Sequence, residues 1–266
     1  MEAARESRRR KLAEADALLA SLDAFVLDRL GLTVPEEQEN KAFAVRLADL
    51  KGRRIDALAY KPFFTKGHPP KTPVQPLSSL AEIDPPTGKM PSDETTLVPY
   101  VGLPECDLTE IREVAMRPYS EVKGRGAFRA GDILFARIEP SVFNKKYVLA
   151  EDLRCCDFAF TSTEFYVVRP HDDMSRYFLY SMFFCSFVFA QVRGKTTGSS
   201  GRRRIDPELF ANLMIPVPSK AMQDEIAKEV THRRLEARRL REEAAREWEA
   251  AKARFEAKLL GSEAAQ

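Results

Sequence analysis

The sequence predicts an α+β fold: one globular domain with a mixed or antiparallel sheet, flanked by long helices that form a coiled-coil stalk. Two observations support this prediction. At both ends of the chain, apolar residues recur every three or four positions, which is typical of amphipathic helices. Between these ends, short runs rich in Val, Ile, Phe and Tyr are separated by Gly, Pro and Asp, the pattern of strands joined by turns.

The first helix is expected over residues 2–30. Its apolar residues form a single seam, and Gly31 followed by Pro35 supplies the stop signal. We assign residues 1–34 to this N-terminal helix, as a coiled-coil, dimer or partner contact. The seam consists of Leu12, Ala15, Leu19, Leu22, Val26 and Leu30.

The globular domain is expected over residues 35–218. It begins with a short helix or strand within 36–54, where 41–46 alternate as an edge strand would. Residues 62–104 then hold ten of the 17 prolines. This density excludes long helices and central strands, and it favours loops or short edge strands wrapped on a core.

The rest of this domain mixes strands and helices. Residues 170–173 (Pro-His-Asp-Asp) offer a cap for a helix over 174–192. After a basic loop, Asp206-Pro207 starts a short helical turn, and a strand ends at Pro218. The expected strands before the helix lie at 98–103, 131–137, 146–149 and 163–169.

The third segment, 219–266, is expected to be helical from Lys220 to about Leu259. A helix of about 40 residues is ~60 Å long, more than a domain of this size usually covers. The two helical seams are therefore expected to pack on each other, within the chain or across a dimer. The second seam has coiled-coil-like spacing and consists of Ile226, Val230, Ala237, Leu240, Ala244, Trp248, Ala251, Phe255 and Leu259.

Composition limits the possible functions. The net charge is only +2 among 31% charged residues, so any nucleic-acid surface must come from local clustering. The four cysteines lack zinc-site spacing, and no signal peptide is recognisable, so we expect a reduced, cytoplasmic protein. The longest uncharged run, 177–192, is shorter than the ~20 residues that span a membrane.

Catalytic signals are weak. Asp84-Pro-Pro-Thr87 resembles the motif with which amino-methyltransferases hold a flipped base, but Thr87 lacks the aromatic ring that stacks on it. Asp132 and Glu164 suggest a nuclease-type metal pair, yet no third carboxylate accompanies them. The three histidines are isolated. We therefore expect no catalytic residue, no cofactor and no metal on this chain.

Binding signals are stronger. The segment 193–204 combines basic side chains with hydroxyls and three glycines, which suit contact with phosphates and close backbone approach. Two smaller basic sets surround Gly124 and Pro140. The candidate DNA-binding residues are Lys123, Arg125, Arg129, Arg137, Lys145, Lys146, Arg193, Lys195, Thr196, Thr197, Ser199, Ser200, Arg202, Arg203 and Arg204.

Taken together, the chain resembles the DNA specificity subunit of a Type I restriction–modification system. The resemblance covers most of 96–260 and, more loosely, 1–35. The stretches that carry it are Ala17–Asp23 with Leu30-Gly31, Tyr100–Leu103, Gly131–Arg137, Ser162–Val168, Thr197–Gly201 with Arg204-Ile205, and Ile215–Pro218 with Gln223 and Ile226.

The resemblance implies a non-catalytic protein that reads double-stranded DNA for other subunits. Such subunits read a bipartite site, one half-site per target recognition domain. They dock adenine-N6 methyltransferase (modification) subunits, on which S-adenosylmethionine is expected, and recruit a restriction translocase where one is present. The resemblance places residues 196–204 in or along the DNA groove, with Arg137, Lys145 and Lys146 supporting the backbone, and makes the helices a spacer.

This sequence shows one recognition domain, where the family usually has two. The resemblance therefore implies a half-subunit that dimerises through its helices and reads a palindromic split site. Pairing with a different half, or membership in a longer gene product, also remains open. Two other readings compete: a non-catalytic coiled-coil adaptor for protein partners, and a DNA-modifying enzyme with an unrecognised motif.

Overall fold

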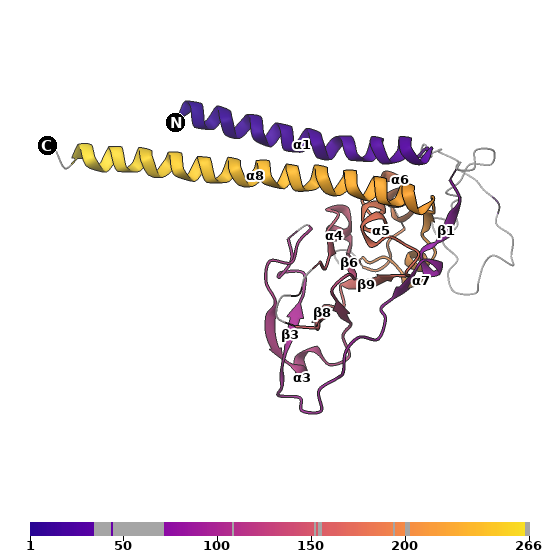
Figure 1. Cartoon of the computed structure of the whole chain (residues 1–266). Coiled ribbons are helices and arrows are strands. Elements are labelled where there is room, and N and C mark those ends of the chain that lie inside the picture. The colour runs from indigo at the N-terminus through magenta and orange to yellow at the C-terminus, as the bar shows by residue number, and fades with distance from the viewer. Residues whose placement is uncertain are drawn as a thin grey trace. The chain divides into compact units, whose positions relative to one another are not determined.

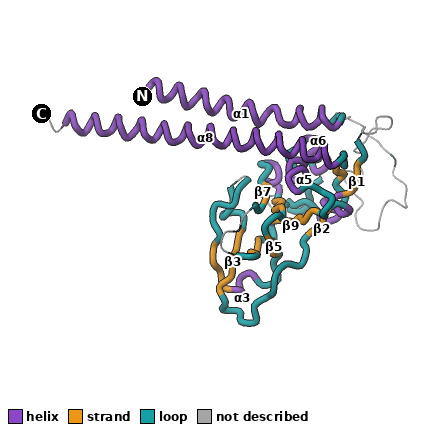
Figure 2. The backbone as a smooth tube through the Cα atoms, viewed as in Figure 1, coloured by secondary structure: helices purple, strands orange, loops and turns teal. Residues whose placement is uncertain are grey.

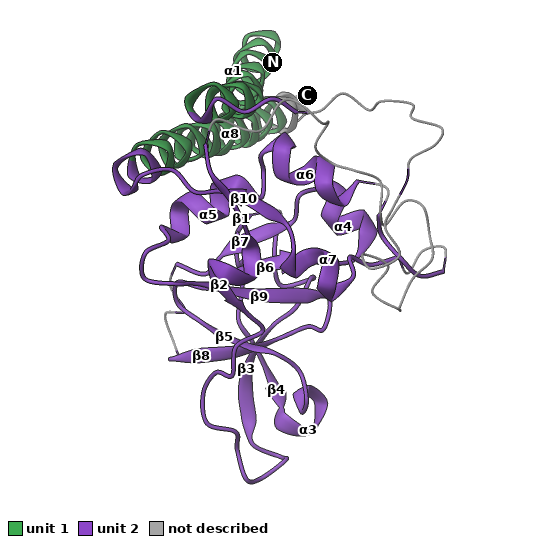
Figure 3. Ribbon diagram, turned by 90° about the vertical axis from the view of Figure 1, so that its right-hand side faces the viewer, with its two compact units in different colours: residues 1–29, 225–266 green, residues 30–224 purple. Residues whose placement is uncertain are grey.

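The computed structural model describes residues 1–34, 44, 72–107, 109–151, 153, 156–193, 195–199 and 203–263. The chain divides into two compact units (Figure 3), residues 1–29 with 225–266 and residues 30–224. The expected element within 36–54 lies outside the described residues, apart from Ala44. The α+β class predicted from the sequence is confirmed by the mixture of helices and strands.

Two antiparallel helices make up the first unit (Figure 1). Helix α1 spans Glu2–Leu30, and helix α8 spans Lys220–Glu263. Gly31 follows α1 with a φ of 60°, the left-handed conformation in which glycine commonly ends a helix. Both helices therefore match the ranges predicted from apolar periodicity, with α8 a few residues longer at its end.

The two apolar seams pack on each other within the chain. Ala15 of α1 and Ala237 of α8 are almost fully buried, and they form one cluster with Leu240. Charged pairs join the same helices beside this cluster: Lys11 Nζ lies 3.1 Å from Glu243 Oε2, and Arg241 lies 2.7 Å from Asp16. Small residues at the centre let the helices approach closely, since each contact there involves only a methyl group.

Enlarging one of these alanines should destabilise the helix pair. We expect Ala15→Leu to lower the free energy of unfolding by about 1–3 kcal/mol, because the added carbons must displace α8 or leave their preferred rotamers. Ala17→Leu is the matched control, since Ala17 is exposed on the same helix. Urea unfolding followed by far-UV circular dichroism measures both, and equal losses would contradict the packing described here.

Among the described residues of the second unit, the strands (orange in Figure 2) form two four-stranded sheets and one two-stranded sheet, where the sequence predicts a single sheet. The first has the order β2-β9-β6-β7, and all its neighbours are antiparallel. Its strands are β2 (Ala81–Ile83), β6 (Ile133–Ala136), β7 (Tyr147–Leu149) and β9 (Phe165–Pro170). The two-stranded sheet pairs β1 (Val74–Pro76) with β10 (Met214–Pro216).

The other four-stranded sheet has the order β4-β3-β8-β5, and its β3–β8 pair is parallel. Its strands are β3 (Leu97–Val101), β4 (Ala115–Pro118), β5 (Ala127–Arg129) and β8 (Phe158–Thr161). The expectation that the proline-rich stretch holds no central strand is wrong here, because β3 is paired on both sides. Pro99 is tolerated since pairing with β8 begins only at Tyr100, so the ladder on that side does not need the missing N–H.

The helices of this unit are short. They are η2 (Leu77–Ser79, a 3-10 turn), α3 (Tyr119–Val122), α4 (Glu139–Phe143), α5 (Arg176–Met182), α6 (Ser186–Val192) and α7 (Pro207–Ala211). Asp206 caps α7, accepting from the backbone N–H of Glu208 and Leu209, so the predicted turn at Asp206-Pro207 is confirmed.

The continuous helix predicted over 174–192 is wrong, because the chain breaks between α5 and α6. Ser175, rather than the acidic residues before it, caps α5 by accepting from the N–H of Phe178. At the break, the rings of Phe183 and Phe184 both contact the ring of Tyr147. The distances between ring centres are 6.1 Å for Phe183 and 5.3 Å for Phe184. Adjacent residues of a continuous helix point about 100° apart, so the break lets both rings reach one aromatic cluster.

One hydrophobic core joins the two four-stranded sheets. It combines buried residues of β6, β7 and β9 with buried residues of β3, β5 and β8, including Leu134, Val148 and Val167 from the first sheet and Val101 and Phe128 from the second. Every residue of β6 is buried, which is why this run is apolar throughout rather than alternating. The loops at the edges of these sheets are therefore held on a rigid support.

Candidate nucleic-acid interface

The basic segment 193–204 follows α6 (Ser186–Val192), and residues 193, 195–199 and 203–204 of it are described. Within it, Thr197 and Arg204 are paired through their backbones, and the N–H group of each donates to the other's carbonyl at 2.8 Å. Gly198 has a φ of 118°, a conformation that residues with a Cβ rarely adopt, and Ser199 is exposed. Ser200 and Arg202 lie outside the described residues.

This loop is fastened to the junction between β6 and α4. Glu139 N–H donates to the carbonyl of Arg203 at 2.8 Å, and Ile205 N–H donates to the carbonyl of Arg137 at 2.9 Å. Side chains add to the connection: Thr196, only 2% exposed, donates its hydroxyl to Glu139 Oε1 at 3.0 Å. Arg203 in turn donates to the Thr196 carbonyl at 2.8 Å, so the loop base is a connected polar network.

The last arginine of the loop is held by an acidic partner. Arg204 makes a two-pronged ion pair with Glu164, with distances of 2.9 Å and 2.5 Å. The hydrogen bond to this carboxylate raises the pKa of Arg204 above its ordinary value. Bidentate geometry of this kind fixes the direction of a guanidinium, so the carboxylate orients Arg204 at the loop base.

Arg137 lies on the same side of the fold. Its guanidinium carbon is 4.5 Å from the centre of the Tyr166 ring, a cation–π contact. The Tyr166 hydroxyl donates to the Ile205 carbonyl at 2.9 Å. Burial raises the pKa of Tyr166 to about 12, against the opposing effect of Arg137, so the hydroxyl stays protonated and remains a donor.

The two lysines near Pro140 are committed to internal contacts. Lys145 Nζ donates to the Phe184 carbonyl at 2.9 Å, and Lys146 Nζ donates to the Leu103 carbonyl at 2.6 Å. At the start of the loop, Arg193 is exposed and Lys195 is half-buried. A phosphate contact by Lys145 and Lys146 stays a prediction. To make it, each ammonium group would have to bind a phosphate while it also donates to an internal carbonyl.

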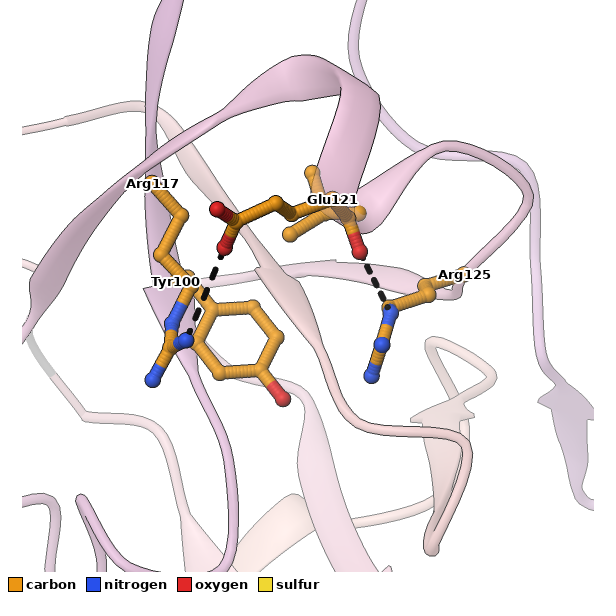
Figure 4. Close-up of a pocket in the computed structure, with 5 residues that line it drawn as sticks. Tyr100, Arg117, Glu121 and Arg125 are labelled. Atoms are coloured by element: carbon orange, nitrogen blue, oxygen red, sulfur yellow. Dashed lines mark hydrogen bonds and ion pairs between the residues drawn. The ribbon is translucent and has the colours of Figure 1, made fainter.

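The second predicted basic set flanks strand β5, with Lys123 and Arg125 before it and Arg129 at its end. Lys123 pairs with Glu94 at 2.6 Å, and Arg129 is exposed as the last residue of β5. Arg125 lines a small pocket with Tyr100, Arg117, Glu121 and Val122 (Figure 4).

Several residues of these sites escaped the sequence analysis. Glu164 is predicted from the sequence only as a metal ligand, and Glu139 and Arg117 carry no sequence signal for a site. Glu139 and Glu164 reach their partners Arg203 and Arg204 only after folding, and Arg117 is a single arginine with no basic neighbour in sequence. A local pattern gives no signal for such pairs.

The residues considered for catalysis have structural roles. Asp132 is almost fully buried and pairs with Arg169, whose guanidinium also donates to the Thr87 hydroxyl at 2.7 Å. Glu164 pairs with Arg204. Within the described ranges, no group of three or more His, Cys, Asp and Glu side chains is placed to hold a metal ion. The Asp84–Thr87 motif is a turn, with Asp84 at a φ of 51°.

No helix in the described part of the chain combines the length and apolar character needed to cross a membrane. No protein-family model and no curated protein sequence matches the chain.

Solved structures do match. One is a chain from a structure described as the basis of complex assembly and conformational transition of the type I R–M system, with a TM-score of 0.56 and 15% sequence identity. Another is the HsdS subunit from Thermoanaerobacter tengcongensis, with a TM-score of 0.53 and 14% identity. In both cases the alignment covers 95% of this chain and 53% of the matched chain. The chain therefore has the fold of the specificity subunits of Type I restriction–modification systems, and it spans about half their length.

Proposed function

We propose that this protein is a sequence-specific DNA-binding specificity subunit of a Type I restriction–modification system, containing one target recognition domain. The observation that carries the proposal is the fold likeness over 95% of the chain to about half of each matched subunit. Two such halves, related by two-fold symmetry, would read the two parts of a palindromic split site. The other half is either a second copy of this chain or a different recognition domain.

In this proposal the chain is not itself an enzyme. It docks an adenine-N6 methyltransferase subunit, which carries S-adenosylmethionine, and a restriction translocase where one is present. It acts in the cytoplasm, where such complexes meet chromosomal DNA. The antiparallel helices of the first unit serve as spacer and docking surface, and the second unit binds DNA. The ordered base of the 193–204 loop supports this assignment, because a reader of DNA needs side chains held in register.

Co-expression with an adenine-N6 methyltransferase subunit from the same genome tests the proposal. We expect a stable complex that methylates genomic adenines within one split motif, as found by methylome sequencing. A homodimer gives a palindromic motif, and a mixed pair gives two different half-sites. Methyl transfer by this chain alone, or a complex that methylates without any motif, would contradict the proposal.

The basic loop supplies a second prediction. We expect Arg203→Gln to weaken duplex DNA binding and to make the plot of log affinity against log salt shallower by about 0.9, the value for one lost phosphate contact. Arg112→Gln is the control, since Arg112 is an exposed arginine paired with Asp107 in the same unit. Fluorescence anisotropy between 50 and 200 mM salt measures both. An unchanged slope in Arg203→Gln means that this arginine makes no phosphate contact.

A further inference from the structure

The pocket beneath α3 brings two arginines to one tyrosine. Tyr100 comes from β3, Arg117 from the neighbouring edge strand β4, and Arg125 from the turn after α3 (Figure 4). The guanidinium carbons lie 4.7 Å and 5.9 Å from the centre of the tyrosine ring. The cavity has a volume of about 250 Å³, large enough for a small ligand group.

Arg117 is fixed by its surroundings. It pairs with Glu105 at 3.2 Å and, more loosely, with Glu121 at 3.7 Å. Glu105 is itself buried, and its other oxygen accepts from the N–H of Gly102 at 2.9 Å. Arg117 Nε is buried and has no hydrogen-bond partner among the described residues. An unpaired buried donor is costly, so an acceptor that reached this nitrogen would stabilise the side chain.

Arg125 keeps its terminal nitrogens available. Its Nε donates to the Glu121 carbonyl at 3.1 Å, which holds the side chain against the turn. Among residues that the structure describes, no hydrogen bond reaches its two terminal nitrogens or the Tyr100 hydroxyl. Gly124, with a φ of 76°, makes the turn that returns Arg125 to the tyrosine. The pocket therefore presents a convergent set of donors.

We propose that this pocket binds one backbone phosphate of duplex DNA, with Arg125 and Arg117 as the cationic donors and the Tyr100 hydroxyl as a third. A stacked base is not the natural ligand, because both guanidinium groups already lie against the Tyr100 ring. Base edges lie at the floor of a groove and are read by projecting side chains, whereas these arginines lie in a hollow. A phosphate protrudes from the duplex, so it can enter.

Two acidic side chains, Glu105 and Glu121, pair with Arg117 at this pocket, and they allow a more specific test. Glu105 is buried and serves to hold Arg117. Glu121 is exposed, and its loose pair with Arg117 is of the kind that contributes little to stability. An incoming phosphate would take its place beside Arg117. Removing the charge of Glu121 should therefore strengthen phosphate binding, while removing the charge of Arg125 should weaken it.

This inference rests on the proposed function, and the experiment separates the two. The complex with the methyltransferase is titrated with duplexes that contain or lack the methylated motif, at several salt concentrations. We expect Arg125→Gln to lose about tenfold in affinity for both duplexes, the loss of one charge-assisted hydrogen bond, and to make the salt slope shallower by about 0.9. Glu121→Gln should bind both duplexes more tightly, and Arg112→Gln should match the wild type.

Each of the other outcomes shows whether the proposed function or the phosphate site is wrong. If the wild-type complex binds no duplex, the proposed function is wrong. If the wild type binds but Arg125→Gln keeps its slope and affinity, the pocket is not a phosphate site. A loss confined to the motif-bearing duplex means that the pocket reads a base. Saturable binding of inorganic phosphate to the wild type, with the DNA slope unchanged in Arg125→Gln, assigns the pocket to a free anion and overturns the proposal.

Discussion

Phe210→Ala should lower the free energy of unfolding of the second unit, residues 30–224, by about 3–5 kcal/mol. Phe210 is fully buried and lies at the centre of an aromatic cluster. Its ring stacks on Tyr166 with 4.4 Å between ring centres, and it lies 4.7 Å from the ring of Phe135. Removing it leaves a cavity lined by rigid rings from several elements, which cannot collapse to fill the space.

Phe143→Ala is the matched control for this prediction. Phe143 is 40% exposed and belongs to the same unit, so its truncation should cost much less. Chemical denaturation followed by tyrosine fluorescence compares the two variants. Because Tyr166 also donates to the Ile205 carbonyl beside the basic loop, Phe210→Ala should also weaken DNA binding at temperatures where the variant is still folded. A loss below about 1 kcal/mol would show that the cluster is loosely packed.

The second large effect concerns the buried ion pair of Asp132 and Arg169. Asp132→Asn should destabilise the unit by about 3–5 kcal/mol, because the guanidinium is left buried without its counter-charge. The Asp132 and Arg169 side chains are only 2% and 16% exposed, and the pair is 2.7 Å apart. The carboxylate also accepts from the N–H of Arg129 at 2.9 Å, so it organises the turn before β6.

A double variant tests whether the unpaired charge causes this loss. Asp132→Asn combined with Arg169→Met removes both charges while keeping most of the volume, and it should recover most of the stability lost in Asp132→Asn alone. Both are measured by urea unfolding. If the double variant is as unstable as the two single changes added together, the side chains do not act as a pair.

Elements whose apolar spacing repeats over many residues could be predicted from the sequence with nearly correct bounds. Helices α1 and α8 are the clearest cases, because each repeats its seam over many turns. Strands β6, β7 and β9 were also located, since each is a short apolar run between turn residues. The break between α5 and α6 was missed because it depends on where Phe183 and Phe184 find aromatic partners. No local pattern contains that information.

The parallel pairing of β3 with β8 lies outside the reach of sequence patterns for the same reason. Its strands come from residues about 60 positions apart, and the Thr161 hydroxyl donates to the Val101 carbonyl across that separation. The candidate site shows the limit most clearly. Basic residues can be selected by composition, but Lys145 and Arg204 acquire internal partners only in the folded chain, and Arg117 meets Tyr100 only across two strands.

The antiparallel pairing of α1 with α8 has a consequence for synthesis on the ribosome. Lys11 and its partner Glu243 are 232 residues apart. At about 5–20 residues per second, α1 waits on the order of 10–50 s for α8 to emerge. The intervening unit can complete its own core during that time, while the apolar stripe of α1 stays uncovered. The apolar stripe of α1 is therefore covered by α8 only after nearly the whole chain has been synthesised.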